Sequence, residues 1–220
     1  QAEWQAVMNG NSNDILATPS YFAGKPNNPV EEVSGYDIFV FCNRKSIQEG
    51  LTPVYSINSS TNPNEWGTVP TSYDATWEAV IINSSANGYR LPTESEWAYA
   101  AIGGPAGVGK ITDYAGSNNI EDVAWYKNNN TTNGEIYGTK AVGRKMPNEL
   151  GIYDMSGNVC EWCSYGDYGC IIGGSWSDSD YYCNIILYGR SIITESMTYR
   201  NLSWLGHDYG KLGFRLARSF

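Results

Sequence analysis

From residue 112 to the end of the chain, glycine, asparagine, aspartate and proline interrupt the sequence every few residues. These residue types favour turns, and their spacing leaves no stretch in which a periodic apolar helix face could develop. We therefore expect short strands joined by long structured loops in this half of the chain. Helical spacing of apolar residues occurs earlier, over residues 1–8 and 36–48, and residues 51–57 fit one short strand.

The clearest local signal is the stretch GYRLPTESEWAYAA. Thr93 and Glu96 have the spacing of a capping box, in which each side chain accepts a hydrogen bond from the backbone N–H of the other residue. This spacing predicts a helix that begins after Thr93 and carries Trp97 and Ala101 on one face. The glycine pair at 103–104 is expected to end the helix.

Composition bounds the class of protein. The 220 residues are enough for one domain, which we expect to span residues 1–220. Aromatic residues make up 14% of the chain, including 17 tyrosines and 8 tryptophans, so we expect a core built on large rings. The net charge is −9 and the 14 lysines and arginines are scattered, which argues against nucleic acid as a partner because phosphates require clustered positive charge.

Targeting segments are not visible in the sequence. No apolar run approaches the roughly 20 residues of a membrane-spanning helix, and no signal peptide is present. Any export signal or anchor is therefore expected upstream of Gln1. The chain opens directly on the helical pattern QAEWQAVM, which favours a truncated or processed start.

The five cysteines divide into one isolated residue and one cluster. Cys42 lies in the apolar run IFVFC and is most simply a buried free thiol. Cys160, Cys163, Cys170 and Cys183 follow the spacing C-x2-C-x6-C-x12-C, which fits a four-thiolate zinc site or disulfides. Zinc ribbons usually have a second C-x2-C pair, so disulfides in an oxidising compartment are favoured. Three pairings are open, and Cys163 with Cys183 is our first choice.

Two motifs have ordinary explanations. The stretch GPAGVGK at 104–110 fits G-x-x-x-x-G-K, but a helix precedes it and Ile111 stands where a phosphate loop needs serine or threonine, so we interpret it as a turn. The single histidine, His207, has no nucleophile-elbow pattern around it and is expected to be a loop residue. Pairs of neighbouring acids occur in several turns, but none is singled out, and we predict no catalytic residue.

The stretch YDMSGNVCEWC offers hard oxygen donors for a cation. Asp154 and Glu161 lie seven residues apart, and Gly157 allows a tight turn between them. Two carboxylates and inward-pointing carbonyl groups from such a turn fit calcium. The same residue types also stabilise turns by capping their own backbone, so the spacing alone is a weak signal.

Seven stretches, in order, resemble the sulfatase-modifying, formylglycine-generating-enzyme superfamily. They are QAEWQAVM, FCNRKS with EGLTPVYSI, NGYRLPTESEWAYAA, DVAWY, PNELGIYDMSGNVCEWC, GGSW and GFRLAR. The resemblance implies an α+β, C-type-lectin-like fold: a mixed, mostly antiparallel sheet, two or so helices and extensive ordered loops. The family's first strand has no counterpart before QAEW. The resemblance also places a structural calcium at Asp154, Gly157, Val159 and Glu161, and no other cofactor is required. A second calcium site of some enzymes is not expected here.

The catalytic members of this superfamily hold copper with two cysteines after the glycine pair. When the sequences are aligned on Gly173 and Gly174, the later cysteine matches Cys183 and the earlier one falls on Asp178. Copper(I) prefers two soft thiolates, which a carboxylate and a thiolate do not reproduce. The resemblance therefore implies a non-catalytic member.

Residues 177–193, SDSDYYCNIILYGRSII, are rich in tyrosine, serine and aspartate and contain no lysine, glutamate, glutamine, methionine or tryptophan. This is the composition of antibody-like binding loops. It also resembles the variable region of retroelement-diversified proteins, in which asparagine codons are rewritten at adenines to give such residues. The stretch LGHDYG at 205–210 obeys the same rule. Glu195, Met197, Trp204 and Lys211 break it and are expected to be fixed framework positions.

We therefore predict a non-catalytic, diversified ligand-binding protein of receptor or adhesin type, whose variable segment spans residues 173–220. The expected framework positions are Gly173, Gly174, Ser175, Trp176, Gly213, Phe214 and Arg215. The expected ligand-binding residues are Ser177, Asp178, Asp180, Tyr181, Tyr182, Tyr188, Ile192, Ile193, His207, Asp208 and Tyr209. The alternatives are a copper-dependent formylglycine-generating oxidase, a structural or regulatory domain of the same fold, and an ordinary tyrosine-rich loop.

Partner and location follow from the same resemblance. Aromatic and apolar side chains anchor protein interfaces, so the expected partner is a protein or another cell-surface molecule. We expect a monomer outside the cytoplasm, held at the cell surface as a bacterial lipoprotein by an anchor that is not in this chain.

Overall fold

The computed structural model describes residues 1–107, 110–130, 137–166, 168–186, 191–193, 197–198, 200 and 210–219. A four-stranded sheet with the order β6-β5-β4-β7 lies at its centre. Its strands are β4 (Cys160–Tyr165), β5 (Tyr168–Ile172), β6 (Ser191–Ile193) and β7 (Leu212–Phe214). β5 is antiparallel to β4 and to β6, whereas β7 is parallel to β4. The predicted mixed, mostly antiparallel sheet is therefore confirmed.

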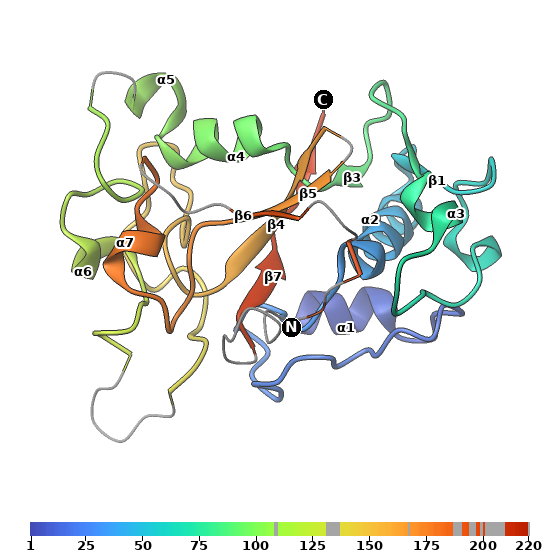
Figure 1. The fold of residues 1–220 in the computed structure, drawn as a ribbon, viewed down its shortest axis with the longest axis horizontal. Coiled ribbons are helices and arrows are strands. Elements are labelled where there is room, and N and C mark those ends of the chain that lie inside the picture. Colours follow the sequence, from blue (N-terminus) through green and yellow to red (C-terminus); the bar gives the residue numbers. More distant parts are fainter. Residues whose placement is uncertain are drawn as a thin grey trace.

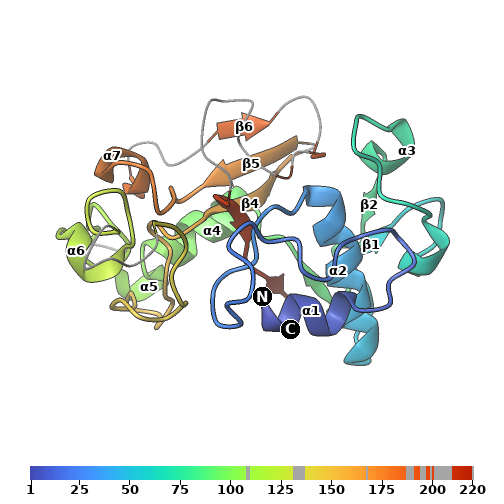
Figure 2. The ribbon, with the colours of Figure 1, turned by 90° about the horizontal axis from the view of Figure 1, so that it is seen from below.

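Helices lie at both ends of the central sheet (Figure 1). One end carries α1 (Ala2–Met8), α2 (Gly35–Gln48) and α3 (Ala75–Glu78), and the other carries α5 (Gly104–Gly107), α6 (Ile120–Val123) and α7 (Asp180–Cys183). The view from below shows the same division (Figure 2). None of the helices in the described part of the chain is long and apolar enough to cross a membrane.

The remaining elements are short. A 3-10 turn (Pro63–Glu65) and two two-stranded sheets complete the fold: β1 (Tyr55–Ser56) pairs with β2 (Ile81–Ile82), and β3 (Tyr89–Arg90) pairs with β8 (Ala217–Arg218). The strand expected over 51–57 is therefore limited to two residues. The described residues form seven α-helices rather than two or so, and four of these are single turns of four residues. A single turn is too short to show apolar periodicity, which is why the sequence does not reveal it.

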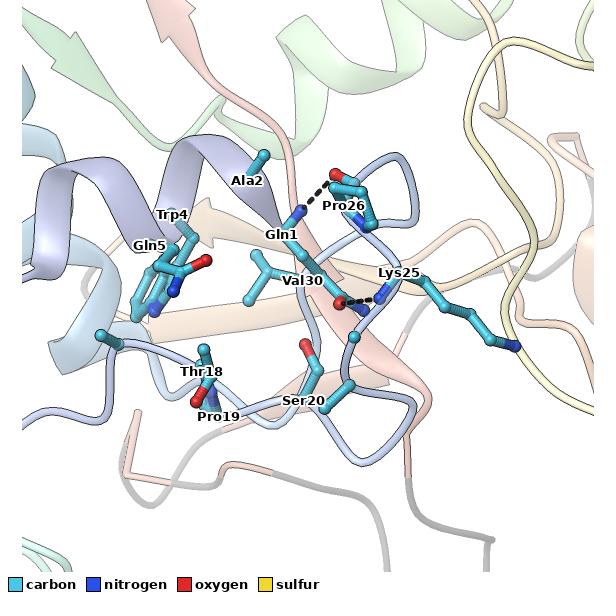
Figure 3. Close-up of a pocket in the computed structure, with 13 residues that line it drawn as sticks. Gln1, Ala2, Trp4, Gln5, Thr18, Pro19, Ser20, Lys25, Pro26 and Val30 are labelled. Atoms are coloured by element: carbon cyan, nitrogen blue, oxygen red, sulfur yellow. Dashed lines mark hydrogen bonds between the residues drawn. The ribbon is translucent and has the colours of Figure 1, made fainter.

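The two N-terminal helices occur where apolar spacing predicts them. Helix α2 begins with a second capping box: Ser34 accepts a hydrogen bond from the Asp37 N–H, and Asp37 accepts one from the Ser34 N–H. On α1, Trp4 is 2% exposed and its ring stacks on Phe41 of α2 at a centroid distance of 5.0 Å. Trp4 also lines a cavity of about 330 Å³ beside the start of α1 (Figure 3).

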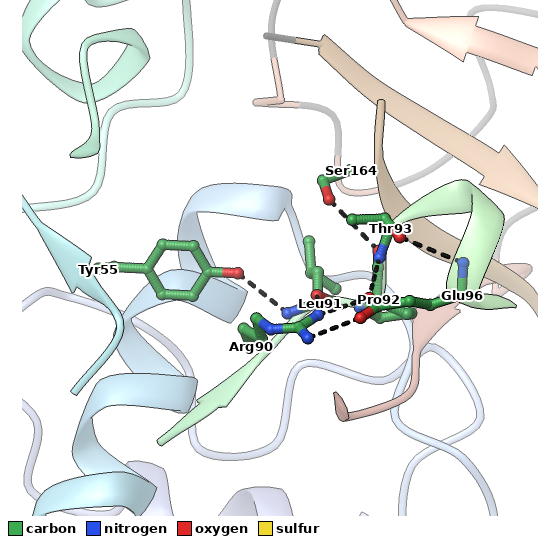
Figure 4. Close-up of polar contacts among 7 residues, drawn as sticks. All are labelled: Tyr55, Arg90, Leu91, Pro92, Thr93, Glu96 and Ser164. Carbon is green, nitrogen blue, oxygen red and sulfur yellow. Dashed lines mark hydrogen bonds and ion pairs between the residues drawn. The ribbon is translucent and has the colours of Figure 1, made fainter. Parts of the chain in front are cut away.

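Helix α4 (Glu94–Ala101) begins at the predicted capping box (Figure 4). Thr93 Oγ1 accepts from the Glu96 N–H at 3.1 Å, and Glu96 Oε2 accepts from the Thr93 N–H at 2.8 Å. The hydrogen-bonded Arg90 guanidinium lowers the pKa of Glu96 to about 2. Trp97 and Ala101 are buried, as the helical spacing predicts. The glycine pair ends α4, but Gly104 also begins the single turn α5.

Large rings fill the core, as the composition predicts. Trp4, Trp97 and Trp162 are each at most 2% exposed, and Tyr36 is fully buried. Most buried residues form one cluster between α1, α2 and one face of the central sheet. A second cluster lies around Trp97 on the other face of β4 and β5.

Candidate functional site

The segment that follows β5 begins with two glycines that fix its path. Gly173 and Gly174 have φ angles of +98° and +69°, which disfavour any residue with a Cβ. A Cβ on Gly174 would lie 2.8 Å from Cys183 Sγ, and one on Gly173 would lie 3.0 Å from the ring of Trp97. Because neither position has room for a Cβ, the glycine pair lets the start of the predicted variable segment pack directly against the core.

Trp176 anchors this segment. Its side chain is 3% exposed, and its Nε1–H donates to the Gly210 carbonyl at 2.9 Å. Phe22 and Tyr137 meet its ring edge-on at centroid distances of 5.4 and 4.7 Å. Trp176 therefore has the environment of a framework residue.

Two residues that hold Trp176 in place, Asn130 and Phe22, could not be predicted from the sequence. Asn130 lies in the polar run NNNTTNG, which is typical of an exposed loop, yet it is fully buried. Its Nδ2 donates to the carbonyl groups of Gly138 and Trp176 at 2.9 and 3.2 Å. The ring of Phe22 packs against Gly138 and Gly210, where a Cβ would lie 2.5 and 2.6 Å from ring atoms. No local pattern could have found either residue, because both act through contacts distant in sequence.

Asp178 does not belong to the exposed face, contrary to the sequence-based expectation. Its Oδ2 accepts hydrogen bonds from the backbone N–H and the hydroxyl of Ser175, at 2.9 and 2.6 Å. The Cys160 thiol donates to the same oxygen at 3.7 Å, and Lys211 Nζ lies 3.5 Å from Oδ1. The carboxylate therefore closes the turn that starts at Ser175 and balances a buried lysine.

Among the described residues of the segment, helix α7 carries exposed tyrosines. Tyr181 and Tyr182 are 50 and 52% exposed, and their rings meet edge-on at a centroid distance of 5.4 Å. Asp180 is also exposed, and Ile186, absent from the predicted set and three residues after α7, is 51% exposed. Ser177 is half buried, and its hydroxyl is buried without a partner among the described residues. Tyr181, Tyr182 and Asp180 therefore share a surface that Ser177 joins only in part.

The side chains of the other predicted ligand-binding residues lie outside the part of the chain that the structure describes. Ile192 and Ile193 lie in β6, at the edge of the central sheet, and only their backbone is described. Tyr188, His207, Asp208 and Tyr209 lie outside the described residues.

The later part of the segment is tied to helix α2. Met197, an expected framework position, is 9% exposed, and its carbonyl accepts from the Gly35 N–H at 2.8 Å. Arg200 forms a two-point ion pair with Asp37, with both N–O distances at 2.8 Å. Because Asp37 also closes the capping box of α2, one buried carboxylate holds both the helix and this part of the segment.

The last three expected framework positions lie in and after β7. Gly213 packs so closely that a Cβ would lie 2.6 Å from the Val30 carbonyl oxygen. The ring of Phe214 meets those of Trp4 and Phe41 edge-on, at 5.9 and 5.4 Å between centroids. Arg215, which follows β7, contacts the predicted calcium turn.

The cysteines do not pair as expected. All five are buried free thiols, so the prediction that Cys163 bonds to Cys183 is wrong. Cys160 and Cys163 lie on strand β4, where residues three apart point to opposite faces, so their C-x2-C spacing brings no thiols together. Cys163 instead lies opposite Cys170 on β5, and Cys183, the last residue of α7, packs in a cluster with Ile120, Ala124 and Tyr126. No cluster of three or more metal-binding side chains occurs within the described ranges.

The predicted calcium turn presents one available carboxylate oxygen. Asp154, with φ of +56°, accepts from the Gly143 N–H through Oδ2 at 2.7 Å. Its Oδ1 is buried without a partner among the described residues, and burial raises the pKa of this carboxyl group. Gly157 has φ of +76°, and a Cβ there would lie 2.4 Å from the Trp125 carbonyl oxygen. Val159 follows at the entrance to β4 and is buried.

The second carboxylate of this turn, that of Glu161, already has two partners. Glu161 forms a two-point ion pair with Arg215, with Nη2 2.8 Å from Oε1, and its Oε2 accepts from Trp97 Nε1 at 2.7 Å. Arg215 Nη2 also donates to the carbonyl groups of Tyr153 and Asp154 at 3.2 Å. Arg215 pairs with the Glu161 carboxylate but reaches Asp154 only at its backbone carbonyl, so the Asp154 carboxylate is the donor of this turn that fits a bound cation.

Two cavities lie away from α7. The cavity in Figure 3 is enclosed by α1 and the loop that contains Thr18 and Lys25. A larger one, of about 640 Å³, shares Trp4 with it and reaches Asp154 and Arg215. Neither of these two cavities is lined by a described ligand-binding position of the variable segment.

This combination of a mixed central sheet, long ordered loops and a core of tryptophans defines a formylglycine-generating-enzyme-like domain with a C-type-lectin-like fold. The chain belongs to the sulfatase-modifying factor enzyme 1-like domain family, and the model of that family matches residues 1–220.

Solved and curated relatives place the chain within this family. Treponema denticola variable protein 1 superposes with a TM-score of 0.74 at 32% identity, over 99% of this chain and 81% of that protein. The chaperone protein LppX of Paenibacillus barcinonensis is 43% identical over 183 residues, and the formylglycine-generating enzyme of Streptomyces coelicolor is 28% identical over 170. These matches cover 74 and 64% of this chain, and 58 and 50% of the two relatives. The similarity to a variable protein supports a non-catalytic scaffold, although enzymes are also among the relatives.

Proposed function

We propose that this chain is a non-catalytic binding protein that uses the surface around helix α7 to bind its ligand. The observation that carries the proposal is the division of the segment after β5. Ser175, Trp176 and Cys183 are buried, whereas Tyr181 and Tyr182 are half exposed. A scaffold that presents a changeable surface needs this separation, because substitutions at exposed positions alter stability by only about ±0.5 kcal/mol.

The residues at the family's copper position do not fit copper(I). Asp178 offers hard oxygens, and those oxygens are already held by Ser175 and Lys211. Burial, together with Asp178 and Asp180, raises the pKa of the Cys183 thiol above its usual range, which disfavours the thiolate that binds metal. Copper(I) needs soft thiolate ligands, so we derive no oxidase activity for this chain.

The partner that best suits this surface is a protein or another cell-surface molecule. Tyrosine presents large, rigid area with a polar tip at low entropic cost, and paired aromatic residues are frequent anchors of interfaces. Tyr181 and Tyr182 form such a pair, and Ile186, a few residues later, is also exposed. In this proposal the chain is a monomer that acts outside the cytoplasm and is attached to the cell surface by an anchor outside this sequence.

We also propose that the segment is diversified at asparagine codons. The test is to compare the coding segment for residues 173–220 among strains and to search the neighbouring DNA for a second copy beside a reverse transcriptase. We expect differences confined to adenines at the exposed positions, with Trp176, Met197 and Lys211 unchanged. A segment that is identical in all strains, without a second copy, would favour a structural or regulatory domain.

The absence of oxidase activity has a direct test. Copper-loaded protein is incubated with a cysteine-containing sulfatase peptide, and the peptide is analysed by mass spectrometry for formylglycine. We expect no more product than a Cys183→Ser variant gives. Copper-dependent turnover above that control would overturn the binding proposal in favour of the enzyme.

A chaperone role is the second candidate, favoured by the 43% identity to LppX. A chaperone would bind exposed apolar segments of many unfolded proteins, whereas the proposed receptor binds one folded partner. Suppression of aggregation of several unrelated denatured enzymes, lost in a Tyr181→Ser and Tyr182→Ser double variant, would favour the chaperone. Protection of none of them would favour the receptor.

We further propose that the turn from Asp154 to Glu161 binds a structural calcium ion. Its principal ligand is Asp154 Oδ1, with carbonyl oxygens of Gly157 and Val159 as the remaining donors suited to calcium. Glu161 contributes mainly through its ion pair with Arg215, which holds the turn against β7.

A further inference from the structure

The centre of the sheet contains two thiols that face each other. The register of β4 and β5 places Cys163 directly opposite Cys170. Both side chains are fully buried in the cluster that contains Trp97 and Met155. Directly opposed residues in antiparallel strands have Cα atoms about 4.5 or 5.5 Å apart. Disulfides bridge Cα separations of about 4.4–6.8 Å, so this register suits a covalent bond without backbone movement.

We infer that Cys163 and Cys170 are an oxidisable pair that closes a disulfide across β4 and β5. The remaining cysteines have different surroundings. Cys160 points to the other face of β4 and donates to Asp178, and Cys183, at the end of α7, lies against Gly174. Cys42 lies on helix α2 within the main core cluster.

The oxidation is a thiol–disulfide exchange with a small disulfide such as oxidised glutathione. The thiolate of one cysteine attacks a glutathione sulfur and releases one glutathione as a thiol. The second cysteine then attacks the mixed disulfide and releases the other. Two protein thiols become one disulfide, and one glutathione disulfide becomes two thiols. Burial raises the pKa of the Cys163 thiol, so the exchange is expected during folding or when the hairpin opens rather than in the closed sheet.

The bond would stiffen the strand pair next to the predicted binding positions. Cys170 is paired on its other side with Ile192 of β6, so Cys163, Cys170 and Ile192 form one row across three strands. Closing a short loop of this kind stabilises a protein of this size enough to raise its melting temperature by about 5–10 °C. This inference does not depend on what the surface around α7 binds.

The test is to refold the reduced full chain in a glutathione redox buffer, block free thiols with an alkylating reagent and map cross-linked peptides by mass spectrometry. We expect the loss of two hydrogens, one cross-link between Cys163 and Cys170, and a melting temperature that falls by about 5–10 °C on reduction. A Cys170→Ala variant should lose the cross-link and the reduction-dependent shift, whereas Cys42→Ala should keep both.

Two results would overturn the inference. One is recovery of all five thiols in the folded wild-type chain after oxidative refolding. The other is a cross-link that joins Cys163 to a different cysteine. The map of the wild-type chain decides between these outcomes even if the Cys170→Ala variant does not fold.

Discussion

Lys211 Nζ lies 3.5 Å from Asp178 Oδ1, and both side chains are nearly closed to water, with 3 and 11% of their surface exposed. Lys211 precedes β7, whereas Asp178 follows the glycine pair after β5. The ion pair therefore joins an early and a late position of the predicted variable segment. The resemblance in sequence places Asp178 where a copper-binding cysteine is expected in catalytic members.

Removing Asp178 should destabilise the fold, because it breaks the nearly buried ion pair with Lys211 and the hydrogen bonds to Ser175. We expect Asp178→Ala to lower the free energy of unfolding by about 3–5 kcal/mol. The matched control is Asp180→Ala, only two residues away and exposed, which should change it by no more than about 0.5 kcal/mol. Urea unfolding of both variants measures these free energies. If both variants change the free energy of unfolding equally little, Asp178 belongs to the exposed face after all.

Glu31 should make stability depend on pH near neutrality. The side chain is fully buried and accepts from the backbone N–H groups of Tyr21 and Phe22 at 2.8 and 3.0 Å. Burial raises the pKa of Glu31 from 4.5 to about 7. Between these two values the native state binds more protons than the unfolded state, so the free energy of unfolding falls as pH rises through this window, by on the order of 3 kcal/mol at most.

This dependence is measured by urea unfolding from pH 4.5 to pH 8. A Glu31→Gln variant should lose most of the slope, and the exposed Glu149→Gln control should keep it. An unchanged slope in Glu31→Gln would show that another group titrates. Because Glu31 positions Phe22, which packs on Trp176, the same titration should also alter the near-ultraviolet circular dichroism of the tryptophans.

Calcium should stabilise the chain through Asp154. Adding calcium to chelator-treated protein at about 100 times its dissociation constant should raise the free energy of unfolding by about 2.7 kcal/mol. For a chain of this size, that corresponds to a rise in melting temperature of about 5–10 °C. Asp154→Ala should abolish the rise, and the exposed Asp180→Ala should retain it. A wild-type chain that does not respond to calcium contradicts the site.

The sequence predicts what depends on local pattern. The Thr93–Glu96 capping box predicts α4 and its buried Trp97 face, and Trp176, an expected framework position, is buried. The same approach fails where burial depends on distant contacts. The Asp178 side chain is only 11% exposed, and Lys211, 33 residues later, lies against it. Asn130 lies in a polar run that suggests exposure, but it is buried against the backbone of Trp176.

The cysteines show a different kind of failure. A C-x2-C spacing brings two thiols together in a turn, but on a strand it sends them to opposite faces. Recognising β4 as a strand was therefore necessary before any pairing could be predicted. The register with β5, which only the structure supplies, then selects Cys170 as the neighbour of Cys163.

The central claim is that the surface around α7 is separate from the core that supports it, and a melting series on single variants tests this most directly. Trp176→Ala removes a buried ring and should cost about 3–5 kcal/mol, much of the stability of a domain. Tyr181→Ser and Tyr182→Ser should each change stability by no more than about 0.5 kcal/mol and leave the melting temperature almost unmoved. If both tyrosine variants destabilise the chain as much as Trp176→Ala does, the tyrosines belong to the core and this surface is not a binding face.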